Sequence, residues 1–285
     1  MIKSMTGYGK LSIQLSDKKI NMEIKSLNSK GLDLNVRIPS AYREQELPFR
    51  KKVSAVLERG KIDFGLFIEQ TGAAAAATIN TAVVAAYMEQ LKGIAAAPDA
   101  ALMALALKLP DTLSVQRDDI DPNELAVIEN LLADTLAVMD LSRIAEGALL
   151  ATEFTLRIGN IERLLVQVLD MDGARMAGIK PRLEKALSDI TTPIDQNRLE
   201  QELIYYIEKY DITEEKVRLA GHLHYFNETL GAPDSQGKKL GFIAQEIGRE
   251  INTLGSKANH APMQQLVVQM KDELEKIKEQ LLNAL

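Results

Sequence analysis

Residues 238–259 read KKLGFIAQEIGREINTLGSKAN and have the apolar spacing of an amphipathic helix. Turn residues bound this stretch on both sides, with Pro233 and Gly237 before it and Pro262 after it. In a helix, residues three and four positions apart share one face. The apolar face formed in this way contains Leu240, Ile243, Ile247, Ile251 and Leu254. We therefore expect a helix here, with one side packed in the core of the protein.

The polar and small residues of the same stretch are unusual for a helix that only covers a core. Glu246 and Glu250 lie one turn apart at the edge of the apolar face. Gly241, Gly248 and Gly255 recur along it, and a glycine in a helix interior costs about 1 kcal/mol relative to alanine. We expect another backbone or a ligand to approach this helix closely.

The composition limits the classes of protein that this chain can belong to. Its 285 residues suffice for one large domain or two ordinary ones. A net charge of −6 argues against a protein that coats nucleic acid non-specifically, although it permits a local basic groove. The absence of cysteine excludes disulfides and thiolate metal sites. No run approaches the ~20 apolar residues of a membrane span, and the first residues are not an apolar signal region. We expect a soluble, cytoplasmic protein with no membrane partner.

The first 72 residues predict a small α+β domain with an antiparallel sheet. Apolar and polar residues alternate at 19–25, 32–38 and 61–69, which is the pattern of half-buried strands. Residues 42–59 have a helical pattern that Gly60 ends. Strands and a helix in one compact segment are typical of the α+β class.

From residue 73 onward the chain predicts helices. The alanines at 73–77 form either a mobile connection or the start of a helix. Residues 123–170 predict one very long helix or two in line, and a helix of that length invites a partner subunit. The pattern breaks at Thr191–Pro193. We therefore divide the chain into an N-terminal domain at 1–72, a long-helix region at 73–190 and a C-terminal helical domain at 191–285.

Four helices are predicted in the C-terminal domain. The helix at 197–210 directs Leu199, Leu203, Tyr206, Ile207 and Tyr210 inward, and Thr213 is expected to cap the next helix. After residues 238–259, the last helix has apolar residues in alternating steps of four and three, as in a coiled coil. These residues are Met263, Val267, Met270, Leu274, Ile277 and Leu281. Three heptads are marginal alone, so this helix should pack on another helix of this chain or of a neighbour.

The chemistry of the chain rests on carboxylates, because no phosphate-binding loop, nucleophile elbow, metalloprotease motif or dinucleotide fingerprint is present. Carboxylates converging from separate helices suit magnesium or manganese, which activate water and neutralise phosphate charge. His222 is a candidate general acid or base, and basic side chains can bind phosphate oxygens. The carboxylates are Glu200, Glu202, Glu214, Glu215, Glu246 and Glu250, and the basic residues are Arg218, Lys238, Lys239, Arg249 and Lys257.

Each of these candidates also has an ordinary structural explanation. A glutamate on a helix is usually solvated, and its pair with a basic residue one turn away contributes only about 0.3–0.5 kcal/mol. His222 fits a structural histidine whose hydrogen bonds are satisfied. With 40 acidic residues against 34 basic ones, a solvated charged face is the default interpretation of the basic set.

Six segments of the chain resemble the YicC/YloC endoribonuclease family. SMTGYG at 4–9, SLNSKGLDLNVRIP at 26–39 and ERGKID at 58–63 are similar to its N-terminal domain. NRLEQEL at 197–203, DITEEKVRLAGHLHYF at 211–226 and KKLGFIAQEIGREINTLGSKA at 238–258 are similar to its C-terminal domain. The resemblance implies a metal-dependent endoribonuclease for single-stranded or structured RNA, including small regulatory RNAs. It also implies a homohexamer that encloses RNA in a central channel.

The resemblance also implies roles for particular residues. The family's histidine corresponds to His222, and its acidic positions correspond to Glu200, Glu202, Asp211, Glu214, Glu215, Glu246 and Glu250. Its signature corresponds to Arg249, Asn252, Gly255, Ser256 and Lys257. The sequence departs from the family at Gly241, where an aspartate is usual, and at Lys216, where a leucine is usual. The change at 241 removes a carboxylate that would bind the ion or support a residue that does.

Two main hypotheses follow. In the first, the protein is an endoribonuclease in which Glu202, Glu214, Glu246 and Glu250 hold Mn²⁺ or Mg²⁺. Its catalytic residues are His222, Glu246 and Glu250, and its RNA-binding residues are Arg218, Lys238, Lys239, Arg249, Asn252 and Lys257. In the alternative, a non-catalytic oligomeric adaptor delivers RNA to another nuclease and needs no ion. A purely structural helical oligomer, the third possibility, would bind no RNA.

Overall fold

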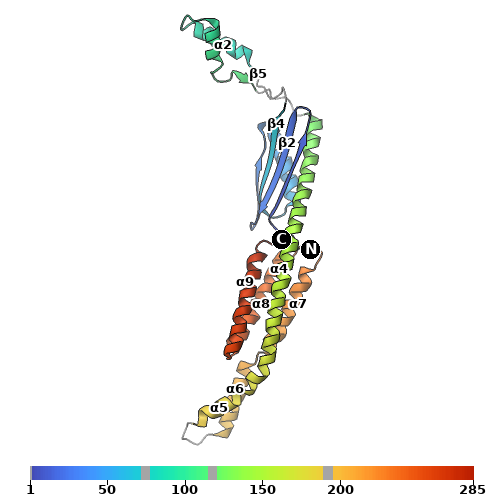
Figure 1. The fold of residues 1–285 in the computed structure, drawn as a ribbon, viewed down its shortest axis with the longest axis vertical. Helices are drawn as coiled ribbons and strands as arrows, with labels where there is room; N and C mark the ends of the chain where they lie inside the picture. Colours follow the sequence, from blue (N-terminus) through green and yellow to red (C-terminus); the bar gives the residue numbers. More distant parts are fainter. Residues whose placement is uncertain (1, 72–77, 115–120, 189–194) are drawn as a thin grey trace. The chain divides into compact units, whose positions relative to one another are not determined.

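The computed structural model describes residues 2–71, 78–114, 121–188 and 195–285 (Figure 1). The alanines at 73–77 and the expected break at Thr191–Pro193 lie outside these residues. Two compact units are present. The sheet unit contains Tyr8–Lys25 and Leu32–Met139, and the helical unit contains Met1–Gly7, Ser26–Gly31 and Asp140–Leu285. The predicted α+β class is confirmed. Each unit draws on separated segments of the chain, and the three sequence domains stay a prediction.

The sheet unit is built on four strands, β1 (Gly7–Gln14), β2 (Lys18–Leu27), β3 (Leu32–Arg37) and β4 (Gly60–Gln70). Their order in the sheet is β1-β2-β4-β3. The expected antiparallel sheet is wrong at one pair, because β3 and β4 run parallel with Leu34 opposite Ile62. A 3₁₀ helix, η1 (Ser40–Gln45), and helix α1 (Glu46–Val56) connect these two strands. A helical crossover of this kind returns the chain in the same direction, which makes the pair parallel.

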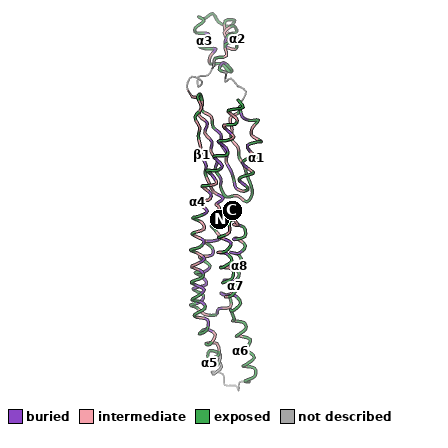
Figure 2. The backbone as a smooth tube through the Cα atoms, turned by 90° about the vertical axis from the view of Figure 1, so that its right-hand side faces the viewer, coloured by how far each residue is buried: buried purple, intermediate pink, exposed green. Residues whose placement is uncertain are grey.

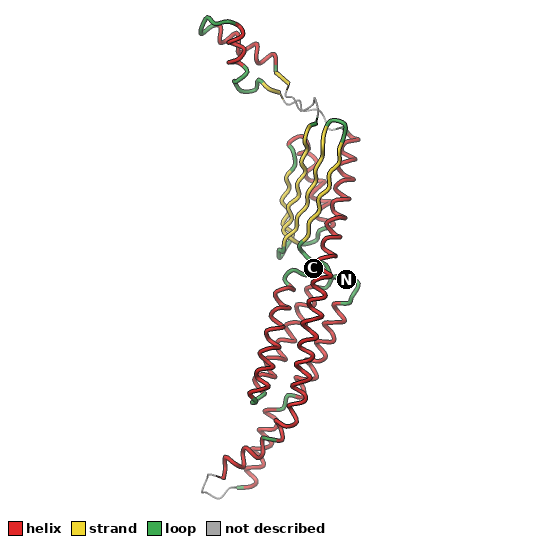
Figure 3. The backbone as a smooth tube through the Cα atoms, in the orientation of Figure 1, coloured by secondary structure: helices red, strands yellow, loops and turns green. Residues whose placement is uncertain are grey.

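One face of this sheet carries the core of the sheet unit. The inward residues of β2 and β4, such as Ile20, Met22 and Phe64, are almost completely buried. They pack against α1 and against the first part of α4 (Pro122–Ala177). Phe49 of α1 packs edge to face on Phe64, with the ring centroids 6.1 Å apart. Figure 3 shows the strands and the helices that cover them. The opposite face is polar and carries Phe67, which is 47% exposed.

A small helical module is also present in the chain between β4 and α4. It contains α2 (Thr81–Lys92) and α3 (Asp99–Ala106), together with two short strands, β5 (Thr78–Ile79) and β6 (Leu113–Ser114). The strands pair antiparallel, with Ile79 opposite Leu113. The two helices agree with the helical character predicted from residue 73 onward, whereas strands of two residues have no periodicity to detect.

The helical unit contains the rest of α4 with α5 (Ile179–Ser188), α6 (Gln196–Tyr210), α7 (Thr213–Leu230), α8 (Gly237–Lys257) and α9 (Ala261–Leu281). Figure 2 shows the buried side of these helices. The five residues of the apolar face predicted at 238–259, from Leu240 to Leu254, are all buried. The six apolar residues of α9 that have coiled-coil spacing lie in the same core. The helices that α9 packs against therefore belong to the same chain. In α6, by contrast, only Leu203 of the five expected inward residues is buried.

The glycines of α8 are explained mainly by α9. A Cβ atom at Gly255 would lie 2.9 Å from Val267 Cγ1, and one at Gly248 would lie 3.2 Å from Leu274 Cδ2. The closest neighbours of these two glycines are therefore side chains of another helix, and not a backbone. Gly241 differs, because a Cβ atom there would meet nothing within 4 Å.

The opening sequence motif has a structural role in the helical unit. The backbone amide of Met5 donates to the carbonyl of Asn283 at 2.7 Å, and Arg143 Nη2 donates to Ser26 Oγ at 2.7 Å. Gly147 leaves room for this segment, because a Cβ atom there would lie 2.2 Å from the Ile2 carbonyl oxygen. The first residues thus lie beside the last ones.

Candidate functional site

The candidate site is built on α7 and α8, which pack against each other in an antiparallel pair. Two contacts fix their register. Lys257 at the end of α8 reaches Glu215 at the start of α7, and Lys239 at the start of α8 lies 4.7 Å above the ring of Tyr225 near the end of α7. In this register the half-buried His222 of α7 and Glu246 of α8 lie at about the same level along the helix pair.

Glu215 and Lys257 form a largely enclosed ion pair between these two helices. Lys257 Nζ lies 2.8 Å from Glu215 Oε1, and Glu215 is only 6% exposed. The other carboxylate oxygen, Oε2, is buried and has no hydrogen-bond partner among the described residues. An unsatisfied buried polar atom lowers the stability of the folded protein by about 1–3 kcal/mol. A residue that served only the fold would not need this buried oxygen, which suggests a further role for Glu215.

A buried cluster of charges adjoins the first turn of α7. Asp172 of α4 accepts hydrogen bonds from Arg175 Nε at 2.9 Å and from Lys216 Nζ at 2.5 Å. Burial alone would raise the pKa of Asp172, but the bonds from Lys216 and Arg175 hold that pKa below its ordinary value. Lys216 is the position where the family usually has leucine, and Asp172 gives this lysine a partner. Nothing in the sequence signalled this pair, because the two residues lie on different helices.

The start of α7 differs from the expectation. Thr213 is the first residue of the helix and not its cap. The backbone amide of Thr213 donates to Asp211 Oδ1 at 2.9 Å. Asp211 therefore supplies the hydrogen-bond acceptor for a free amide at the start of the helix. Hydrogen bonds from the hydroxyl and the backbone amide of Thr213 lower the pKa of Asp211. This acidic position therefore has a local structural function.

The four expected metal ligands do not form a cluster within the described residues. Glu202 is exposed on α6, and Glu214 pairs with Arg218 of its own helix. Glu246 pairs with Arg249 at 2.5 Å, whereas Glu250 is 9% exposed. Across residues 2–71, 78–114, 121–188 and 195–285, no three His, Asp or Glu side chains are arranged to hold a metal ion. The described residues of one copy therefore do not bring the four expected ligands together, and metal binding stays a prediction.

The expected RNA-binding residues lie mostly at the surface of α7 and α8. Lys238, Lys239 and Asn252 are exposed, and the side chains of Arg218 and Arg249 are 58% and 71% exposed. Both arginines are paired with a glutamate on their own helix. These residues are accessible to a large polyanion, but the glutamates beside them reduce the local positive potential.

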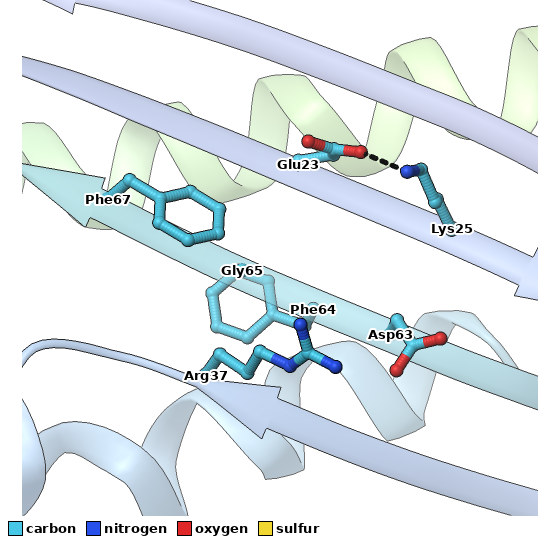
Figure 4. Close-up of a pocket in the computed structure, with 7 residues that line it drawn as sticks. All are labelled: Glu23, Lys25, Arg37, Asp63, Phe64, Gly65 and Phe67. Atoms are coloured by element: carbon cyan, nitrogen blue, oxygen red, sulfur yellow. Dashed lines mark ion pairs between the residues drawn. The ribbon is translucent and has the colours of Figure 1, made fainter.

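Two cavities lie away from these residues. One, of about 310 Å³, lies on the open face of the sheet and is lined by Glu23, Lys25, Arg37, Asp63 and Phe67 (Figure 4). Its floor is Gly65, over which the ring of Phe67 lies, since a Cβ atom at Gly65 would be 2.6 Å from that ring. The other, of about 550 Å³, lies between α4 and α9. Carboxylates line both, which makes them poor sites for phosphate.

None of the helices in the described ranges is both long and apolar enough to cross a bilayer. Two family models match the chain: "Endoribonuclease YicC-like, N-terminal region" matches residues 2–152 and "Endoribonuclease YicC-like, C-terminal" matches residues 169–284. A "Probable endoribonuclease YicC" of Clostridioides difficile (strain 630) is 30% identical over 292 residues and 99% of each chain. A protein of the same description from Haemophilus influenzae is 30% identical over 289 residues, again covering 99% of each chain.

Proposed function

The chain belongs to the family of YicC-like endoribonucleases, and from this premise we propose that it is an endoribonuclease that hydrolyses phosphodiester bonds of RNA. Relatives named as probable endoribonucleases cover almost the whole chain. The single structural observation that supports the proposal best is the Glu215–Lys257 pair. It holds the lysine of the family signature at the junction of α7 and α8 and leaves one buried carboxylate oxygen without a partner in the described structure.

The proposed chemistry needs three kinds of group. In hydrolysis, a base takes a proton from water, the water oxygen attacks phosphorus, and the leaving oxygen takes up a proton as its bond to phosphorus breaks. Cationic groups stabilise the negative charge that develops on the phosphoryl oxygens. Lys257, oriented by Glu215, is suited to this last role, with Arg218 and Arg249 as further phosphate ligands. His222, at about the height of Glu246, is the candidate for proton transfer.

Metal dependence is a separate part of the proposal. We propose that cleavage requires Mn²⁺ or Mg²⁺, on the strength of the family resemblance and of the carboxylates Glu246 and Glu250. No step is assigned to an ion, since the described residues of one chain bring no three ligands together. Turnover of small regulatory RNAs is proposed on the same resemblance, and a cytoplasmic location is proposed from the composition of the chain.

The test is cleavage of end-labelled single-stranded RNA by the purified full chain, with Mn²⁺, Mg²⁺ or EDTA. Lys257→Met and the double variant Glu246→Ala/Glu250→Ala should each abolish cleavage. Lys52→Met is a matched control, because Lys52 joins two elements of the sheet unit through a 2.9 Å pair with Glu129. Undiminished cleavage by the double variant would remove Glu246 and Glu250 from the mechanism, and full activity in EDTA would remove the ion.

One observation favours the alternative function, an oligomeric adaptor that binds RNA and delivers it to another nuclease. The described residues gather no metal site, and an adaptor needs none. In the same experiment, an adaptor would shift the RNA in a binding assay and leave it intact under every ionic condition. Absence of both binding and cleavage would leave only a structural role.

We also propose that the protein is a homo-oligomer, with six subunits by family resemblance. The part of α4 in the helical unit carries exposed apolar side chains on the side opposite its buried ones. Leu149, Leu156 and Val166 are 72%, 52% and 55% exposed. A line of large apolar side chains in water is a common mark of a protein interface. A second copy of the chain is the partner that the proposal requires.

A further inference from the structure

A cavity of about 230 Å³ opens in the helical unit where α4, α5 and α6 meet the turn between α8 and α9. Six residues line it, and they are Arg175, Ile179, Arg182, Tyr206, Tyr210 and Asn259. Pockets for drug-sized ligands measure about 300–1,000 Å³, so this one suits a smaller group such as one nucleobase. We call it the tyrosine pocket.

The aromatic wall of the pocket is a short stack of rings. Tyr206 and Tyr210 lie one turn apart on α6, and their rings are stacked with centroids 5.8 Å apart and planes inclined by 21°. The rings of Tyr205 and Tyr206 pack edge to face with their centroids 5.6 Å apart. Lys209 Nζ lies 5.6 Å from the centroid of the Tyr205 ring. Both pocket tyrosines are half-buried and lie outside the apolar core clusters. The rings therefore form a preformed platform beside solvent.

The polar wall is held in place by the buried charge cluster. Arg175 Nη2 donates to Asp172 Oδ1 at 2.7 Å and to the carbonyl of Tyr210 at 2.8 Å. These bonds tie the guanidinium to the end of the same helix that carries the rings. Arg182 is exposed and has no ion-pair partner in the described part of the chain. The amide of Asn259 can both donate and accept, as the edges of RNA bases require.

The pocket also adjoins the candidate site. Asn259 follows Lys257 by two positions along the chain. Asp172, which holds Arg175, also binds Lys216, the residue next to Glu215. A nucleotide in the pocket would thus lie along the same strand as a phosphate at Lys257.

We propose that the tyrosine pocket binds one unstacked base of a single-stranded RNA substrate, an inference that rests on the proposed endoribonuclease function. The base stacks on the ring of Tyr206 or Tyr210, Asn259 hydrogen-bonds its edge, and Arg182 contacts a flanking phosphate. Proteins recognise single-stranded RNA in this way because every base has a face to stack and a strand outside a duplex leaves that face accessible. The pocket would therefore make the enzyme prefer unpaired RNA and position it for cleavage at Lys257.

The test compares two fluorescently labelled 12-nucleotide RNAs, one with all bases and one with abasic positions throughout its centre. Tyr206→Leu, Tyr210→Leu and the double variant should raise the Kd for the complete RNA by roughly 5- to 150-fold per stacked base. They should leave the Kd for the abasic RNA unchanged, because its phosphates remain. The Tyr→Phe variants keep the ring and should bind both RNAs like the wild type.

Phe67→Leu, at the cavity on the sheet, is the matched aromatic control, and thermal melting shows that each variant is folded. Unchanged binding of the complete RNA by the double variant would overturn the proposal. Equal loss for both RNAs, or a loss in Phe67→Leu alone, would also overturn it. Wild-type protein that cuts RNA while the tyrosine variants bind normally would refute the pocket alone. Wild-type protein that neither binds nor cuts RNA would refute the proposed function as well.

Discussion

Lys257 Nζ lies 2.8 Å from Glu215 Oε1 and joins the end of α8 to the start of α7. The glutamate side chain is 8% exposed and the lysine side chain 33%, so the pair is shielded on the carboxylate side. Removing only the lysine leaves a buried carboxylate without its cation, whereas removing both charges leaves two neutral side chains. The structural and functional roles of Lys257 can therefore be separated.

Lys257→Met should lower the free energy of unfolding by about 1–3 kcal/mol, which is the cost of leaving a buried polar group unpartnered. Adding Glu215→Gln should recover part of this loss, because an amide carries no charge. Urea denaturation of the two variants measures both quantities. Recovery of stability without recovery of RNA cleavage would identify a direct role of the ammonium group. A single variant as stable as the wild type would contradict the ion pair.

The charge cluster at Asp172 predicts a pH dependence of stability. Its pKa in the folded protein lies below the ordinary value of 3.8, because the bonds from Lys216 and Arg175 outweigh burial. Its stabilising effect is thus fully present above the pKa of the unfolded chain and is lost as the pH falls through the folded pKa. Asp172→Asn should destabilise the protein at neutral pH, and the difference from the wild type should shrink below about pH 4.

Asp134→Asn on the exposed side of α4 is the control for this measurement. Denaturant unfolding at several pH values measures both variants, and at neutral pH the loss of stability should be larger for Asp172→Asn than for the exposed Asp134→Asn. A difference between Asp172→Asn and the wild type that stayed constant down to pH 2 would argue against the ionised carboxylate as its source.

Two glycines of α8 should respond to alanine in opposite directions. Gly241→Ala should stabilise the protein by about 0.5–1 kcal/mol, because its Cβ meets nothing within 4 Å and alanine favours the helix. Gly255→Ala should destabilise it by about 1 kcal/mol or more, because its Cβ would lie 2.9 Å from Val267 Cγ1. Thermal melting of the two variants provides the measurement. Stabilisation by Gly255→Ala would show that α9 does not pack against Gly255 as described, and destabilisation by Gly241→Ala would show that its Cβ is not in open space.

Asp211→Ala should weaken the start of α7. Its carboxylate accepts the backbone amide of Thr213, and loss of a helix-start acceptor costs about 0.5–2 kcal/mol. Asp211→Asn keeps an acceptor oxygen and should lose less. Amide hydrogen exchange in the first turn of α7 would report the change locally, and identical exchange in the alanine variant and the wild type would count against this role.

The exposed apolar side chains of α4 should be needed for assembly. Leu149→Glu/Leu156→Glu should give smaller particles than the wild type, because charges cannot be buried cheaply between subunits. Val268→Glu is the control, since Val268 is 64% exposed on another helix. Sedimentation velocity measures the particle size. An unchanged oligomer in the double variant would place the interface elsewhere, and a monomeric wild type would refute the oligomer.

The sequence predicted most of the local elements, because the apolar residues of a helix or strand recur at the period of that element. Ile20, Met22 and Ile24 alternate along β2, and all three are completely buried. The apolar face from Leu240 to Leu254 predicted both α8 and its buried side. The coiled-coil spacing of the apolar residues from Met263 to Leu281 likewise predicted α9 and its packing on another helix. In each case the spacing reports which side of a single element is apolar, so no knowledge of the rest of the chain is required.

Only the tertiary structure decided which elements meet. The parallel pairing of β3 and β4 and the bond from Lys216 to Asp172 join residues that are distant in sequence. Carboxylates at similar helical spacing ended in different places, with Glu215 buried against Lys257 and Glu214 exposed beside Arg218. The sequence by itself determined the family, most of the helices and the three strands with a clear alternation of apolar and polar residues. The packing of one helix on another determined the partners of each charge, because that packing selects which of its faces leaves water.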